Sequence, residues 1–292
     1  MIRTHPLGFS WEESAELPYG SVRNGDRAGD SSPGCPADAG ERARRVGPIL
    51  IGTSGWTYKD WRGRFYPPKL PQREWLAYYT TRFPTVELNV TTYRLPKQHD
   101  LERWAAVPPG FVYTVKLSRL ITHRKRPGEP RQFVDNYMAR VAPLTPRVAN
   151  FLAQFPPFWA RDDDALRGFL DTLPRQHRYV IEFRNASWYH DDVYAILRKH
   201  GMSLCVHDMR DSIAPHVVTG PVLYVRLHGP VRAYAGSYAR TKLARWASTI
   251  RTMAPHVDAT FVYFNNDQNA YAPRNAETLI DLLANDGAVR SP

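Results

Sequence analysis

The sequence predicts an α/β fold, a (β/α)8 TIM barrel that follows a disordered N-terminal extension. From Pro48 onward, apolar runs of strand length alternate with amphipathic segments of helix length. Eight such repeats within residues 48–292 are typical of this barrel. A doubly wound open sheet is the competing α/β architecture, but the sequence lacks its glycine-rich fingerprints, GxGxxG and GxxxxGKS/T.

The extension comprises residues 1–47. Its second half, residues 21–47, has no aromatic residue and is rich in Gly, Asp, Ser and Arg. A segment of this composition cannot bury enough apolar surface to offset the conformational entropy lost on ordering. We therefore expect residues 1–47 to be disordered and residues 48–292 to form the barrel domain.

The predicted strands are short apolar runs bounded by turns or helical patterns. In chain order they span 49–53, 85–89, 111–116, 148–154, 178–184, 202–208, 222–228 and 260–266. The helical segments span 71–82, 97–106, 133–142, 162–173, 190–200, 240–254 and 270–284. The link between the sixth and seventh strands is short and carries little helical pattern.

The net charge favours anionic partners. The chain carries a formal charge of +11 at pH 7, while residues 1–47 hold six Lys/Arg and seven Asp/Glu, which leaves +12 on the remainder. A basic folded domain is suited to phosphates, carboxylates or nucleic acid. Charge that serves only solubility explains the same number equally well.

The sequence also indicates in which cellular compartment the protein is expected. No apolar run approaches the roughly 20 residues that span a bilayer, and the N-terminus lacks the apolar core of a signal peptide. The two cysteines, Cys35 and Cys205, make neither a disulfide framework nor a CxxC metal motif. We expect a cytoplasmic protein with no membrane contact, and the sequence leaves its oligomeric state open.

Polar residues recur near the ends of the predicted strands. Side chains alternate between two strand faces, and in a barrel one face packs on the helices while the other points inward. In YVRLHG (224–229), Val225 and Leu227 share the apolar face that packs on the helices. Arg226 and His228 are therefore expected to point inward. The same alternation turns inward Glu87, Asn89, Lys116, Glu182 and Arg184. Three further strands end on Gln154, on Asp208, and on Asn265, Asn266 and Asp267.

These residues form a candidate active site, because TIM-barrel catalytic residues come from the C-terminal ends of several strands. Arg184 and Arg226 are expected to hold an anion through their planar guanidinium groups. The catalytic candidates, which would supply an acid and a base near neutral pH, are Glu87, Lys116, Glu182, Asp208 and His228. The candidates for positioning substrate are Asn89, Gln154, Asn265 and Asn266. The alternative is a structural network in which three acids neutralise three cations.

Three loops extend this candidate site. GPVRAYAGSY, after the seventh strand, offers Arg232 and glycine backbone N–H groups to a phosphate, or is simply flexible. SGWTYKDWRGRFYP, after the first strand, alternates aromatic and basic residues, so Trp56 is either a stacking residue or part of a self-packed lid. Trp188 is expected to complete the same aromatic wall. SRLITHRKRPGEPR, after the third strand, is a basic run at the same mouth.

Nine segments resemble the DUF72 (YecE-like) family, a domain of unknown function with a TIM-barrel fold. They are GTSGW (52–56), WRGRFYP (61–67), YYTTRFPTVELNVTTYRLP (78–96), VKLSRLITH (115–123), AQFPP (153–157), EFRNASW (182–188), YVRLHG (224–229), GSY (236–238) and YFNND (263–267). The resemblance covers about residues 49–284 in order. It implies the fold and no particular reaction. Residues 1–47 and the run RKRPGEPRQF (124–133) depart from the pattern.

The favoured hypothesis is an enzyme that uses the strand-end cluster for acid/base chemistry on an anionic substrate, phosphorylated or carboxylated, with no cofactor. One alternative is a non-catalytic module that binds nucleic acid or an anionic ligand, which would need cations and aromatic rings but not three inward acids. The other is a barrel that depends on a divalent metal, such as an isomerase or a phosphodiesterase. Inward cations would compete with the metal for the same carboxylates, so this alternative is the less favoured.

Overall fold

The computed structural model describes residues 46–92, 95–124, 131–209, 212–231 and 233–285. The predicted disordered extension, residues 1–47, lies almost entirely outside these residues, and its disorder stays a prediction. Most of the basic run 124–131 and Arg232 also lie outside them.

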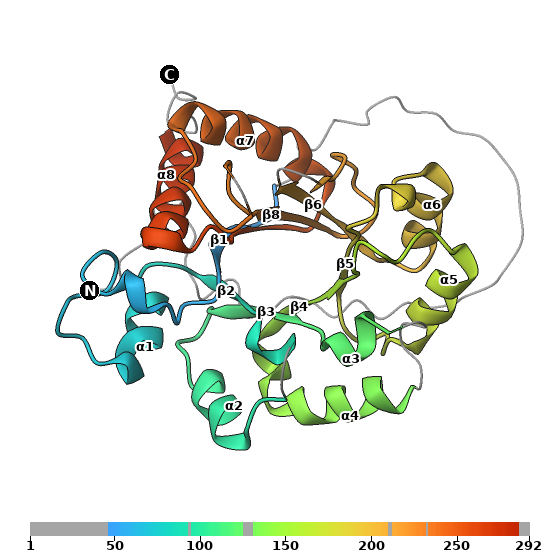
Figure 1. Cartoon of the computed structure of the whole chain (residues 1–292), viewed down its shortest axis with the longest axis horizontal. Helices are drawn as coiled ribbons and strands as arrows, with labels where there is room; N and C mark the ends of the chain where they lie inside the picture. Colours follow the sequence, from blue (N-terminus) through green and yellow to red (C-terminus); the bar gives the residue numbers. More distant parts are fainter. Residues whose placement is uncertain (1–45, 93–94, 125–130, 210–211, 232, 286–292) are drawn as a thin grey trace, which may run out of the picture.

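Eight parallel strands close into a barrel, which confirms the TIM-barrel prediction (Figure 1). Neighbouring strands pair in the order β5-β4-β3-β2-β1-β9-β8-β6, and the pairing of β5 with β6 closes the ring. The barrel strands are β1 (Ile49–Ser54), β2 (Thr85–Leu88), β3 (Val112–Lys116), β4 (Val148–Gln154), β5 (Tyr179–Glu182), β6 (Ser203–Met209), β8 (Val222–Leu227) and β9 (Ala259–Phe264). A short strand, β7 (Ser212–Ile213), pairs antiparallel with the end of β6.

The helices cover the outside of the barrel, and all except the short α3, which was not predicted, coincide with segments predicted from hydrophobic periodicity. They are α1 (Trp75–Thr80), α2 (Gln98–Ala105), α3 (Arg119–Thr122), α4 (Gln132–Val141), α5 (Asp163–Thr172), α6 (Asp191–Lys199), α7 (Arg240–Met253) and α8 (Tyr271–Asn285). The described part of the connection from β6 to β8 holds β7 and no helix, as the sequence indicated. None of the described helices is long and apolar enough to cross a membrane.

Helix α5 illustrates how local sequence sets these elements. The side chain of Asp162 accepts a hydrogen bond from the Ala165 N–H (2.9 Å) and so caps the first turn. Leu166, Phe169 and Leu170 recur at helical spacing, and all three are buried against the barrel. The cap fixes where the helix starts, and the apolar stripe fixes which face it turns inward.

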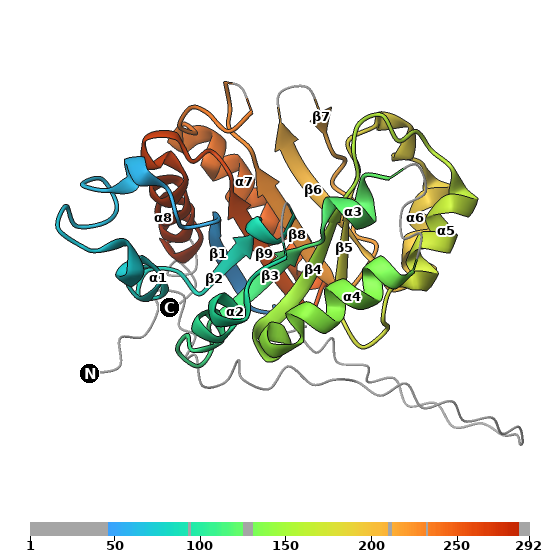
Figure 2. The ribbon, with the colours of Figure 1, turned by 60° about the horizontal axis from the view of Figure 1, so that its bottom comes forward.

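The alternation of side chains divides the barrel into two apolar regions. Residues on the outer strand faces, such as Val86 and Ile181, pack against the helices in the larger core. A smaller core fills the inside of the barrel and includes Leu50, Val180 and Phe261. Above this inner core, towards the C-terminal ends of the strands, the inward residues become polar. That end is the mouth of the barrel, which lies at the top of Figure 2.

Candidate functional site

A chain of buried ion pairs crosses the inside of the barrel at its mouth. The Arg226 guanidinium of β8 donates to Glu87 Oε1 of β2 and to Glu182 Oε2 of β5, each at 2.6 Å. Glu182 also pairs with Arg184, which follows β5. Glu87, Glu182 and Arg226 are at most 1% exposed. The sequence correctly predicted that all four side chains point into the barrel, and in the structure they form one network of ion pairs.

Glu87 is held by three neighbours. Besides Arg226, the Ser54 hydroxyl donates to its Oε1 (2.8 Å) and the Tyr224 hydroxyl donates to its Oε2 (2.6 Å). Ser54 and Tyr224 come from the inner faces of β1 and β8. A carboxylate whose two oxygens accept three hydrogen bonds is fixed in position, so Glu87 anchors the network.

Two cations keep Glu182 ionised. Burial alone would raise the pKa of this carboxyl, but Arg184 and Arg226 beside it hold the pKa well below its ordinary range. Glu182 is therefore a carboxylate at neutral pH. It is a strong hydrogen-bond acceptor and a poor proton donor.

His228 is neutral. Burial first, and then the positive charge of Arg226, hold its pKa well below the ordinary value. Arg184 donates to His228 Nε2 (3.0 Å), so this nitrogen is the acceptor and Nδ1 carries the proton. The Asn265 amide nitrogen lies 3.1 Å from Nδ1, and the amide must be turned by 180° for its oxygen to accept this proton. His228 therefore positions Arg184, with both ring nitrogens engaged.

Lys116, at the end of β3, differs from the two arginines. Its Nζ donates to the Gln154 amide oxygen at the end of β4 (2.9 Å), and it is only partly buried. Burial, followed by the charge of Arg226, lowers its pKa to about 8. A lysine with this pKa can gain or lose a proton near neutral pH.

The prediction for strand β6 was wrong by one residue. Asp208 points outward to the helix layer, where its carboxylate pairs with Lys242 of α7 (2.7 Å). His207, its neighbour, is the inward residue in register with Arg226, and it is fully buried. Its Nε2 contacts the Ser212 hydroxyl (2.8 Å), and its Nδ1 lies 4.0 Å from Glu182. Burial lowers the pKa of His207 to about 4.

Two other predicted contacts with substrate are corrected. Asn266 points away from the mouth and donates to the Gly236 carbonyl and to Asn275 Oδ1, both at 2.8 Å. It therefore ties the loop after β8 to helix α8. Trp188 is fully buried, stacks on Phe183 at 4.6 Å between ring centroids, and donates to the Trp159 carbonyl. It is a core residue and forms no wall of the mouth.

Asp267 is a titratable group whose role the sequence left ambiguous. It follows β9, is partly buried, and its Oδ1 has no hydrogen-bond partner among the described residues. Burial raises its pKa to about 8, a hydrogen bond with Tyr58 opposes the rise, and the nearby Asp60 and Glu87 add to it. The carboxyl is therefore mostly protonated at neutral pH. The signal available in the sequence was its place directly after the last strand.

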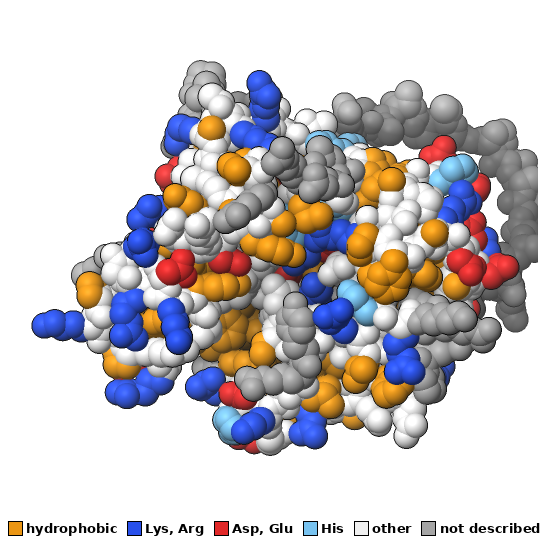
Figure 3. All heavy atoms as spheres, in the orientation of Figure 1, with side chains coloured by type: hydrophobic (Ala, Val, Ile, Leu, Met, Phe, Trp, Pro, Cys, Tyr) orange, Lys and Arg blue, Asp and Glu red, His pale blue; other side chains and the backbone are white. Residues whose placement is uncertain are grey.

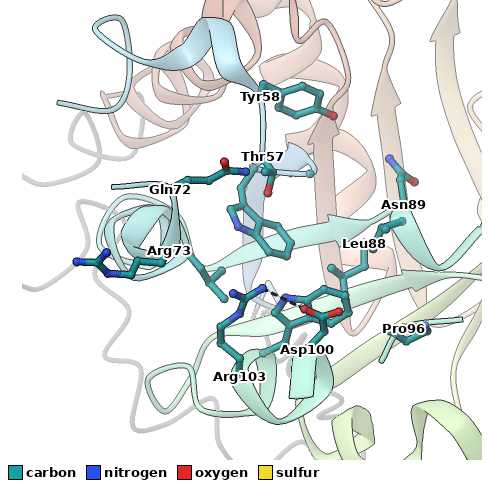
Figure 4. Close-up of a pocket in the computed structure, with 14 residues that line it drawn as sticks. Thr57, Tyr58, Gln72, Arg73, Leu88, Asn89, Pro96, Asp100 and Arg103 are labelled. Carbon is teal, nitrogen blue, oxygen red and sulfur yellow. Dashed lines mark hydrogen bonds and ion pairs between the residues drawn. The ribbon is translucent and has the colours of Figure 1, made fainter. Parts of the chain in front are cut away.

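Trp56 and Asn89 line a cavity of about 620 Å³ beside the barrel mouth (Figure 4). The cavity lies between the loop after β1, the start of α1, the end of β2 and helix α2. Figure 3 looks into the mouth, where Lys and Arg side chains gather around the central hollow. A second hollow, lined by hydrophobic side chains, lies next to it.

Comparison with known proteins identifies the family. The sequence profile described as "Protein of unknown function DUF72" matches residues 50–292. The chain belongs to the DUF72 family. The resemblance noted in the strand-end motifs is thereby confirmed, and the match includes every barrel strand from Leu50 onward.

Relatives of this DUF72 protein match it over half or more of their own length. The UPF0759 protein YunF of Bacillus subtilis (strain 168) is 24% identical over 274 residues, 80% of this chain and 94% of YunF. The UPF0759 protein YecE of Escherichia coli (strain K12) is 30% identical over 143 residues, 48% of this chain and half of YecE. The crystal structure of a DUF72 family protein from Thermotoga maritima MSB8 is 27% identical, with a TM-score of 0.72 over 81% of this chain and 99% of that one.

The described part of this DUF72 barrel offers no group of three or more His, Cys, Asp or Glu side chains arranged to hold a metal ion. Glu87 and Glu182 instead face arginines. Among the described groups at the mouth, Lys116 and Asp267 combine partial access with an available charge or proton, and Arg184 adds a positive charge that is paired with Glu182. The arrangement suits anion binding and proton transfer better than metal coordination.

Proposed function

We propose that this DUF72 barrel is an enzyme that binds an anionic group of its substrate, a phosphate or a carboxylate, at the barrel mouth between Lys116 and Arg184. One observation carries the proposal. The carboxylates of Glu87 and Glu182 are wholly buried and already paired, whereas Lys116 is partly exposed and donates to the neutral Gln154 amide. Arg184 lies beside Glu182, with its side chain 8% exposed. The groups that an incoming ligand meets are therefore cationic.

The charge balance of the network supports the same proposal. Two carboxylates, Glu87 and Glu182, face three cations, Lys116, Arg184 and Arg226. One positive charge is left over in a setting of low dielectric, where an uncompensated charge is costly. A bound anion would balance it, and hydrogen bonds to a charged ligand are stronger there than in water.

Proton transfer is assigned to Asp267, whose pKa lies near 8 and which is the proposed acid while it is protonated. Lys116 also has a pKa near 8, but it holds the anion in its protonated form and is therefore assigned to binding. Glu87, Glu182 and His228, which the sequence suggested as acid/base groups, are reassigned as positioning residues that hold Arg184 and Arg226. No cofactor is required by this scheme, and we place the reaction in the cytoplasm.

Anion binding is tested with sulfate, because sulfate does not titrate near neutral pH. The wild-type protein is expected to bind sulfate, with an affinity that falls as pH rises through the Lys116 pKa of about 8. Lys116→Met should weaken binding by about tenfold or more and abolish this pH dependence. Lys199→Met is the matched control, because Lys199 is exposed at the C-terminal end of α6, away from the mouth. Calorimetry measures both, and equal affinity in all three proteins would refute the anion site.

Catalysis is distinguished from binding by a second readout. The alternative, a module that only binds anions or nucleic acid, predicts affinity without conversion of the ligand. We expect NMR of a panel of phosphorylated sugars and nucleotides to reveal conversion of at least one compound by the wild type. Asp267→Asn should slow that conversion while anion affinity changes little. Binding without any conversion across the panel would favour the alternative.

A further inference from the structure

The cavity beside the mouth has the properties of a second binding subsite. Its apolar lining includes Trp56, Leu76, Leu88 and Trp104, and its volume of about 620 Å³ is within the range of ligand pockets, about 300–1,000 Å³. Arg103 and Asp100 pair across its outer side (3.2 Å), while Tyr58 and Asn89 lie on the side nearer the barrel (Figure 4). Polar groups thus lie on both sides of the apolar lining.

Two buried polar atoms of the lining residues have no hydrogen-bond partner within the described part of the chain. One is a donor, Trp104 Nε1–H, on a side chain that is 5% exposed, and the other is an acceptor, Asn89 Oδ1. Buried polar groups are nearly always satisfied, and an orphaned one costs free energy. Both atoms are buried, so a ligand reaches them where its binding turns the Trp104 and Asn89 side chains toward the cavity, and it then satisfies them by offering one acceptor and one donor.

The two tryptophan rings restrict the shape of the ligand. Trp56 and Trp104 meet edge to face, with centroids 6.0 Å apart and planes at 87°. Trp104 is 5% exposed and Trp56 is partly buried, so the Trp56 ring offers the more accessible surface to a flat partner. A flexible aliphatic chain would fill the volume but would leave both orphaned polar atoms unpaired. A planar heteroaromatic ring satisfies the apolar walls and the polar atoms together.

Asn89 connects the cavity to the proposed anion site. In the pairing of β2 with β3, Glu87 lies opposite Thr114 and Leu88 opposite Val115, so the next step places Asn89 beside Lys116. Adjacent strands are about 4.8 Å apart. The Thr91 hydroxyl, one turn further on, donates to the Lys116 carbonyl (2.7 Å), which fixes the cavity wall against β3. The end of β2 therefore borders both the cavity and the strand that carries Lys116.

We propose that the cavity holds the heteroaromatic ring of a mononucleotide-type ligand whose phosphate lies at Lys116. The inference rests on the proposed function for the phosphate end, and on the Trp56–Trp104 cavity with its two orphaned atoms for the ring end. Each nucleobase presents acceptors and N–H donors along its edge, as the pair Trp104 Nε1–H and Asn89 Oδ1 requires.

The test compares ligands that share a sugar phosphate and differ in whether they carry a nucleobase. The probes are the 5′-monophosphates of adenosine, guanosine, cytidine and uridine, together with ribose 5-phosphate, which lacks the ring. We expect at least one nucleotide to bind about tenfold or more tightly than ribose 5-phosphate, since stacking one base contributes about 1–3 kcal/mol. If no nucleotide binds more tightly than ribose 5-phosphate, the ring site is wrong.

Substitutions in the cavity test the same idea from the protein side. Trp104→Phe keeps an aromatic ring and removes the N–H, so it should reduce the nucleotide advantage about three- to tenfold and leave ribose 5-phosphate binding unchanged. Trp56→Leu should remove most of the advantage. Trp246→Phe is the control, since Trp246 lies in α7, across the barrel from α2 (Figure 1). If nucleotides still bind more tightly than ribose 5-phosphate after both cavity substitutions, the inference is wrong.

The two proposals fail in different ways. If ribose 5-phosphate binds and Lys116→Met abolishes its binding, but the ring adds nothing, the anion site stands and the ring site falls. If the unphosphorylated nucleosides bind in a manner sensitive to Trp104→Phe while ribose 5-phosphate does not bind, the ring site stands. In that case the phosphate-binding role of Lys116 is wrong, and the proposed function falls with it.

Discussion

Arg226 is the residue on which the inner network depends. It joins carboxylates from β2 and β5 to β8, so one side chain links three strands of the barrel. The direct contribution of such a buried network to stability is small on balance, because desolvation of the charges offsets their attraction. Removal of one partner is different, since the remaining charges then lie buried and unpaired.

Arg226→Met is therefore expected to destabilise the protein strongly. Glu87 and Glu182 would be left as two nearby carboxylates with one fewer cation, at a cost of about 3–5 kcal/mol in the free energy of unfolding. Urea denaturation followed by far-UV circular dichroism measures the change. The control is Arg82→Met, which removes the exposed pair of Arg82 with Glu277 and should cost about 1 kcal/mol or less. Similar losses in the two variants would contradict the role given to Arg226.

Single residues also show what the sequence can and cannot predict. Alternation alone turned Arg226 and Glu182 inward, because each stands between apolar neighbours that pack on helices. The prediction that Asp208 faces inward was wrong because Leu204, Cys205 and Val206 are all apolar. Such a run does not indicate which residues of β6 face into the barrel. The sequence could not predict which acid pairs with which cation, because these pairs cross the barrel and depend on how the sheet closes.

Strand β1 carries a glycine at an inward position where a side chain has no room. Gly52 lies opposite Thr85 of β2, and a Cβ at this position would meet the Thr85 carbonyl oxygen at 2.0 Å. That contact is with backbone, which cannot move aside without shifting one strand against the other. Glycine here permits a close approach of two strands directly below Ser54 and Glu87.

A pair of glycine substitutions is expected to have opposite effects. Gly52→Ala should cost more than about 2 kcal/mol of stability, because β1 and β2 must separate. Gly168→Ala should stabilise by about 0.5–1 kcal/mol, because Gly168 is an exposed helical position in α5 with no atom within 4 Å of the new Cβ. Thermal or urea unfolding of both variants measures the difference. Stabilisation by Gly52→Ala would show that the close approach of β1 and β2 is not required.

At the level of elements, the sequence predicted nearly all of the barrel. Strands and helices followed from hydrophobic periodicity, which local sequence carries directly. The cavity between the loop after β1 and helix α2 could not be predicted, because it arises where two segments far apart in sequence meet. Trp56 was noted for its aromatic surroundings, whereas Trp104 looked like an ordinary residue of an amphipathic helix.

For the whole molecule, closure of the barrel concentrates titratable groups in one buried place, and their effects on stability have opposite signs. His207 has a folded pKa of about 4, below its ordinary value, so the unfolded state binds more protons and stability rises with pH between about 4 and 6.5. Asp267 has a folded pKa of about 8, above its ordinary value near 3.8, so here the folded state binds more protons. Its contribution is fully present below pH 3.8 and is lost as pH rises to about 8.

Asp267→Asn isolates this last effect, because every other titration is common to the wild type and the variant. The difference in unfolding free energy should shift in favour of the variant by about 1.4 kcal/mol per pH unit from about pH 4 to about pH 8, and then level off. Asparagine cannot ionise and has nearly the same size and shape as aspartic acid, so the local packing is preserved. Urea denaturation of both proteins at one-unit pH steps gives the difference directly. A difference that does not vary with pH would mean that Asp267 is already ionised in the folded protein, and the proton donor proposed at the barrel mouth would have to be another group.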